Sequence, residues 1–142
     1  MVVERTSSEI KAALKEAGLE VYRTTESAVH IAERPRENLI MDSNVCLRTD
    51  LTVVFVARAE RATFPHDGDA ALFARVRDHL SAATEAGFTE TEAYVTDVTA
   101  PSDASLLLDR WYQVRFEKQT PSFETAIATV RAALELDKIA KR

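Results

Sequence analysis

The near-regular alternation of apolar and polar residues from Val45 to Glu60 limits the possible folds of this chain more than any other segment. A period of two places successive side chains on opposite faces of a β-strand. At about 3.3 Å per residue, one strand of this length would span roughly 50 Å. We therefore expect it either to bend at a bulge or to project beyond the core. Its predicted core face comprises Leu47, Leu51, Val53, Phe55, Ala57 and Ala59.

Three segments carry the signals of helices. A T-x-x-E capping box at Thr6 predicts a first helix over about Ser7–Ala17. Apolar residues at helical spacing predict a second over Asp69–Ala86, which a glycine closes. The third helix is expected after Pro121, because proline fits the first helical position.

The other periodic segments predict strands, separated by glycine, proline and aspartate turn signals. The predicted order is α-β-β-β-α-β-β-α. The fold class is therefore α+β: two layers, with a mainly antiparallel sheet and helices on one face. At 142 residues the chain is expected to form a single domain, residues 1–142. Besides Val45–Glu60, the predicted strands are Leu19–Arg23, Ala28–Ala32, a brief edge segment at Leu39–Met41, Phe88–Thr99 and Leu106–Lys118.

Two details of this map concern the ends of strands. The residues Asp42-Ser43-Asn44 are predicted to form a turn before the long strand, because Asp and Asn favour turns. In the last strand, Leu106 and Leu108 are expected to face the core together with the other apolar residues of that face. The tip between the last two strands is predicted to be a polar loop.

Charge and cysteine content narrow the partners. A formal net charge of −5 disfavours broad contact with a nucleic-acid backbone or an anionic membrane surface. No sequence-specific nucleic acid and no membrane is therefore expected as a partner. Cys46 is the only cysteine, so no internal disulfide can form and a reducing compartment is the simpler interpretation.

No segment matches a catalytic or cofactor-binding motif. The three glycines are too isolated for a phosphate-binding loop, and neither a G-x-S-x-G nor an H-E-x-x-H sequence is present. The best metal candidate, His66–Asp69, is more simply a helix-entry loop with capping aspartates. We interpret Asp97, Asp103 and Asp109 as turn and surface residues rather than paired catalytic carboxylates. The prediction is a protein without enzymatic activity, metal or cofactor.

Charged residues interrupt the predicted strands. They form either an open sheet face in water, where ion pairs contribute little, or a subunit interface where mixed charge fixes the register. Trp111 favours the interface, because exposed aromatic residues are enriched there. Both interpretations stay open. The candidate interface residues are Arg48, Asp50, Arg58, Glu60, Phe64, His66, Arg110, Trp111, Arg115 and Glu117.

Four segments together resemble a known family. They are the first helix with its continuation Leu14–Tyr22, the strand Leu47–Glu60, the helix Ala70–Ala86 followed by Gly87-Phe88, and the strand Arg110–Phe116. In order and size they resemble the tail-terminator (tail-completion) proteins of long-tailed bacteriophages. The resemblance covers nearly the whole chain but contains no invariant signature.

The resemblance implies a structural virion subunit, assembled in the host cytoplasm and located in the tail. Copies would form a ring, usually a hexamer, that caps the tail tube and presents a surface to the head–tail connector protein. The implied partners are the chain itself, the tail tube protein and that connector. Two alternatives remain: an acidic dimeric chaperone of the type III secretion kind, which binds an effector segment, and a small-ligand-binding domain or enzyme with a deep pocket.

Overall fold

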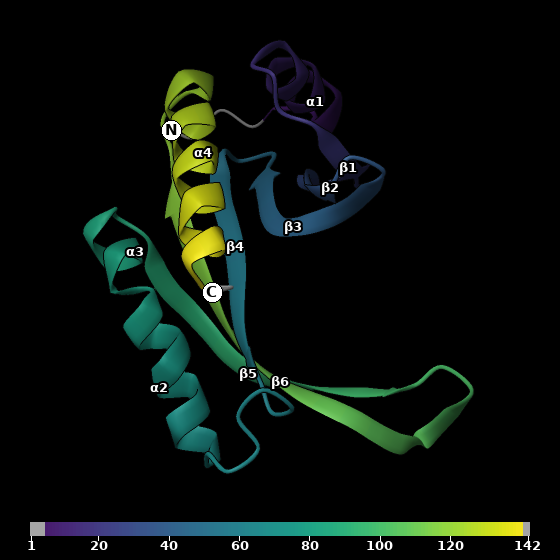
Figure 1. Cartoon of the computed structure of the whole chain (residues 1–142). Helices are drawn as coiled ribbons and strands as arrows, with labels where there is room; N and C mark the ends of the chain where they lie inside the picture. Colours follow the sequence, from purple (N-terminus) through teal and green to yellow (C-terminus); the bar gives the residue numbers. More distant parts are fainter. Residues whose placement is uncertain (1–4, 141–142) are drawn as a thin grey trace.

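The computed structural model describes residues 5–140, so the two ends of the predicted domain lie outside the described residues. The α+β class is confirmed, with one six-stranded antiparallel sheet in the order β1-β2-β3-β4-β6-β5 and four helices packed on it (Figure 1). The elements are α1 (Ser7–Glu16), β1 (Val21–Thr24), β2 (Ala28–Arg36), β3 (Leu39–Arg48), β4 (Thr52–Glu60), α2 (Asp69–His79), α3 (Ser81–Glu85), β5 (Thr89–Ala100), β6 (Asp103–Gln119) and α4 (Phe123–Ala140).

The segment Val45–Glu60 is not one strand but a hairpin, which corrects the prediction that it bends or projects. Leu51 has a φ of 64° and its N–H donates to the carbonyl of Arg48 at 2.9 Å, which reverses the chain between β3 and β4. Leu47 pairs with Val53 across this turn, so the two side chains share a face. Because the turn keeps the alternation in phase, the apolar pattern alone does not reveal it.

The predicted turn Asp42–Asn44 lies inside β3 and is an irregularity of that strand. Asn44 has a φ of 65°, and its N–H donates to Oδ1 of Asp42 at 2.8 Å. The buried Ser43 hydroxyl donates to the carbonyl of Ile31 at 2.7 Å and so ties the irregularity to β2. The turn-type hydrogen bond is therefore present at the predicted position, but it lies within β3 instead of before the start of a strand.

The predicted helix Asp69–Ala86 is divided at Leu80 into α2 and α3. Leu80 has φ −112° and ψ 23°, outside the helical range, while its side chain is buried. No glycine or proline marks the break, so the sequence pattern does not show it.

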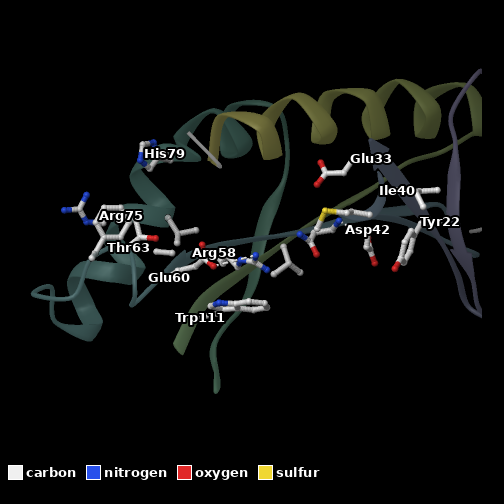
Figure 2. Close-up of a pocket in the computed structure, with 16 residues that line it drawn as sticks. Tyr22, Glu33, Ile40, Asp42, Arg58, Glu60, Thr63, Arg75, His79 and Trp111 are labelled. Atoms are coloured by element: carbon white, nitrogen blue, oxygen red, sulfur yellow. Dashed lines mark hydrogen bonds and ion pairs between the residues drawn. The ribbon is translucent and has the colours of Figure 1, made fainter. Parts of the chain in front are cut away.

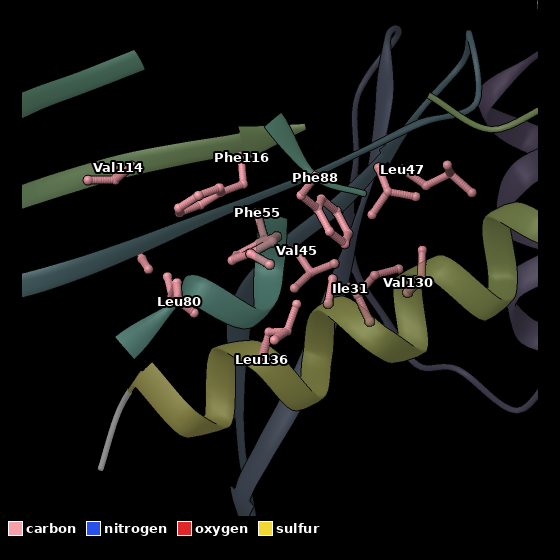
Figure 3. Packing of buried hydrophobic residues seen from close by; sticks show 14 of the residues in the cluster. Ile31, Val45, Leu47, Phe55, Leu80, Phe88, Val114, Phe116, Val130 and Leu136 are labelled. Carbon is pink, nitrogen blue, oxygen red and sulfur yellow. The ribbon is translucent and has the colours of Figure 1, made fainter. Parts of the chain in front are cut away.

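The core lies between the sheet and the helices. Phe55 is at its centre: its ring is edge-on to Phe88 at 5.0 Å and stacked on Phe116 at 5.1 Å between centroids (Figure 3). All four helices contribute buried residues to this one cluster, so they lie on the same face of the sheet, as predicted. The helix residues of the cluster include Ile10, Leu14, Leu72, Val76, Ala83, Val130 and Ala133.

The hairpin of β5 and β6 extends beyond the rest of the sheet. β4 pairs with β6 as far as Glu60 opposite Trp111, and the next residue, Arg61, donates its N–H to the carbonyl of Arg110 at 2.9 Å. Past this point β5 and β6 pair only with each other. We call residues 97–110 the arm; Figure 1 shows it leaving the body on the side away from α2 and α4. The two strands of the arm continue almost to its tip. The loop predicted there is therefore only a tight turn at Pro101-Ser102.

Leu106, Leu107 and Leu108 are 52, 46 and 55% exposed, which corrects the prediction that two of them face the core. The physical reason is that β6 runs past the end of the layer that would cover it. Among the described residues, no helix is long and apolar enough to cross a membrane.

Candidate interaction site

Four of the predicted interface residues form an ion-pair network on the sheet face opposite the helices. Arg48 donates to Asp50 at 2.8 Å and to Glu117 at 3.0 Å, and Nε of Arg115 lies 3.5 Å from the other oxygen of Glu117. The network links β3 and β6 across Val54 of β4, which pairs with Glu117. Its charges are largely satisfied within the subunit, although Nε of Arg115 is buried without a hydrogen-bond partner.

A second group lies farther along the same face. The guanidinium of Arg58 stacks 3.7 Å above the ring of Trp111 and lies 3.8 Å from Glu60. The indole N–H of Trp111 donates to Asp109 at 3.3 Å. At the base of the arm, Arg110 donates to Asp97 at 3.0 Å. Arg58 and Trp111 thus lie together where the arm leaves the sheet, whereas Arg110, the neighbour of Trp111 along β6, alternates to the other face.

The loop between β4 and α2 brings the remaining candidates to the helix side. Arg75 stacks 3.9 Å above the ring of Phe64 and pairs with Asp67 at 2.5 Å. Arg61 donates to Asp69 at 2.7 Å and to the buried Tyr112 hydroxyl at 2.8 Å. His66 is exposed and makes none of these contacts.

The ion pairs of this loop involve the aspartates of the metal candidate His66–Asp69. Both of its carboxylates, Asp67 and Asp69, pair with arginines. The prediction that they cap the helix is wrong, because the N-cap residue of α2 is Gly68 and no side chain accepts a capping hydrogen bond there. Within residues 5–140, no three His, Cys, Asp or Glu side chains are grouped as a metal site would need. The predicted interface residues thus fall into three separate groups rather than one continuous surface.

A cleft of about 640 Å³ opens where the sheet divides. β3 pairs with β4 only from Leu47 to Val45, and then diverges from it while β4 continues to Glu60. In Figure 2, Tyr22 and Ile40 lie at one end, Arg75 and His79 at the other, and Arg58 and Trp111 between them. Apolar residues that line the cleft are Tyr22, Ile40, Met41, Val56, Ala59, Phe64, Val76 and Trp111.

Sequence patterns did not reveal two exposed apolar patches. One is the leucine triplet of the arm, and the other joins Tyr22 of β1 to Leu39, Ile40 and Met41 of β3. The only sequence signal for either is a run of three consecutive apolar residues, which breaks the alternation of a half-buried strand. Leu39–Met41 was predicted to be a brief edge segment, and Leu106 and Leu108 were predicted to face the core; both runs lie near the ends of hairpins.

Two titratable side chains are shielded on the uncovered face. Burial raises the pKa of the Cys46 thiol to about 11, although Arg115 and Arg48 nearby oppose the shift. Burial also lowers the pKa of His30, an effect that Asp42, 3.6 Å away, partly offsets. Both groups are therefore neutral at pH 7, and Cys46 lacks the lowered pKa of a nucleophilic thiol.

We expect Cys46 to be alkylated slowly in the folded protein. A pKa of about 11 instead of 9.0 reduces the thiolate fraction about a hundred-fold at pH 8. Because the thiol ionises more readily in the unfolded chain than in the folded protein, the folded state loses stability as the pH rises from about 9 to about 11. The measurement is the iodoacetamide labelling rate with and without denaturant. Equal rates in both conditions would contradict the shielding.

No protein-family model, no curated protein and no solved structure matches the chain.

Proposed function

We propose that this chain is a structural subunit that assembles with copies of itself, in the manner of the tail terminators of long-tailed phages. The ring, of six copies in that family, occupies the end of the tail tube. Its other face meets the head–tail connector protein. In this proposal the protein is a component of the virion tail, assembled in the host cytoplasm, and it carries out no catalysis.

The observation that supports self-assembly best is the uncovered arm. A two-stranded hairpin is at best marginally stable alone in water. The three leucines of the arm are about half exposed, and clustered exposed apolar side chains mark interaction surfaces. An arm with this composition is expected to be covered in the working state of the protein.

The architecture suits a ring for a second reason. The arm leaves one part of the subunit, while the uncovered β1–β3 patch is on another. An interface between two different surfaces is heterologous, and it gives a closed ring when its rotation closes. The ionic network around Glu117 then provides polar contacts that fix register at the rim. A closed ring leaves no free template for another layer of tube subunits.

One observation favours a second candidate, the secretion-type chaperone. Such a protein needs an exposed apolar groove for an extended effector segment, and the cleft bordered by Tyr22, Ile40 and Met41 has that character. In this candidate the working form is a tight dimer, and the arm serves the dimer interface.

Negative-stain microscopy and light scattering of the purified protein separate the two candidates. We expect closed rings at high protein concentration, because each copy presents both halves of the heterologous interface. A tight dimer without rings would replace the terminator with the chaperone. A monomer of unchanged mass at every concentration would contradict both.

A further inference from the structure

We propose that the cleft of one copy receives the arm of another copy, with Leu106–Leu108 packed between the two walls of the cleft. This inference rests on the proposed self-assembly and identifies the two surfaces that perform it. It assigns an occupant to the cleft and a partner to the arm.

The arm carries apolar side chains on both of its faces. Successive side chains of a strand point to opposite faces, so Leu107 faces away from Leu106 and Leu108. All three are nevertheless about half exposed. A hairpin that lies on a flat surface needs apolar residues on one face only. Leucines on both faces therefore fit a partner with two walls.

The cleft has two such walls. One comes from the β1–β3 side and includes Tyr22, Ile40 and Met41. The other comes from the loop before α2 and from α2 itself, where Phe64 and Val76 line it. Between the walls, Val56, Ala59 and Trp111 of β4 and β6 complete the lining (Figure 2).

The size of the cleft suits the leucine triplet. Each leucine side chain has four carbon atoms and occupies on the order of 120 Å³, taking about 30 Å³ per heavy atom as for a water molecule. Three of them fill roughly 360 Å³ of the approximately 640 Å³ in the cleft. The remaining volume accommodates backbone of the inserted strand.

Both surfaces also offer a free strand edge. From Val56 to Glu60, β4 pairs with β6 alone among the described strands, because β3 has diverged. Along the arm, residues 103–108 of β6 pair with β5 alone, whereas the Arg110 carbonyl accepts from the N–H of Arg61 at 2.9 Å. Unpaired edges form backbone hydrogen bonds with an added strand, which is the recognition mode of β-augmentation. The arm strand can thus satisfy the β4 edge while its leucines contact the walls.

An arm cannot occupy the cleft of its own subunit. Trp111 lines the cleft and lies in β6 next to the arm, so the arm begins at the cleft. Figure 1 shows that the arm then leaves the body of the subunit. The occupant is therefore the arm of a second copy.

Disulfide trapping between two variants of different mass tests this directly. One variant carries Leu107→Cys and the other Ile40→Cys, both with Cys46→Ala, and they are mixed at high concentration under mild oxidation. We expect a mixed dimer at least about ten-fold more abundant than with Glu124→Cys in place of Ile40→Cys, because position 124 is exposed on α4, outside the cleft.

The outcomes separate this inference from the proposed function. If the unmodified protein forms oligomers but the Leu107→Cys and Ile40→Cys pair links no better than the control pair, the arm–cleft contact is wrong and self-assembly stands. If the protein forms no oligomer and the pair does not link, both are wrong. Preferential linkage of the pair supports both.

Discussion

Serine at positions 106, 107 and 108 is expected to weaken self-association at least about 40-fold while leaving the fold of the subunit unchanged. Full burial of one leucine stabilises by roughly 1.5–3 kcal/mol. The three leucines are about half exposed in the subunit, so covering them contributes roughly 2–4.5 kcal/mol to assembly. Each 1.4 kcal/mol corresponds to about a ten-fold change in affinity. The dissociation constant of the oligomer, measured by sedimentation, checks the prediction.

Val95→Ser is the matched control for the triple variant. Val95 is 45% exposed, like the leucines, but it lies on β5 opposite Tyr112, within the body of the sheet. We expect this variant to associate as the unmodified protein does. Thermal unfolding of the triple variant should match the unmodified subunit within a few degrees when both are compared as monomers. Association that survives the triple substitution would contradict the role of the arm.

Phe55→Ala is expected to cost about 3–5 kcal/mol of folding free energy, the usual cost for a buried phenylalanine. Phe55 is fully buried and its ring contacts those of Phe88 and Phe116, so the cavity is enclosed on several sides. A domain of this size is typically stable by about 5–15 kcal/mol, so a large share is lost. Urea unfolding of the monomer gives the value.

Tyr22→Ala serves as the control for the core substitution. Tyr22 is exposed, so its removal should change the free energy of unfolding by less than about 0.5 kcal/mol. A cost below about 1 kcal/mol for Phe55→Ala would show that the aromatic cluster is not the centre of the core.

The local periodicity of the sequence correctly predicted several buried side chains, but it did not predict where the chain turns. Val53, Phe55 and Ala57 are buried as the alternation indicated. The turn at Leu51 preserves the phase of that alternation, and the break at Leu80 lacks any glycine or proline. Both depend on contacts with distant elements, which a local pattern does not contain.

The exposed leucines illustrate the same limit. Apolar residues of β6 lie both before and after Trp111. Those before it are exposed because β4, the neighbouring strand, ends at Glu60 opposite Trp111. The cleft was not predicted because five separated segments line it: β1, β2, β3, the β4–α2 region and β6. Arg48 and Glu117 do lie together as charged strand residues, whereas their role in an interface stays a prediction.

The most direct test of assembly through the arm is the sedimentation mass of the untagged protein over rising concentration, beside that of the triple serine variant. We predict that the mass of the unmodified protein rises from the 15.8 kDa of one subunit to that of a closed oligomer, while the variant stays at 15.8 kDa. An unmodified protein that keeps the mass of one subunit throughout, or a variant that assembles equally well, would contradict the claim.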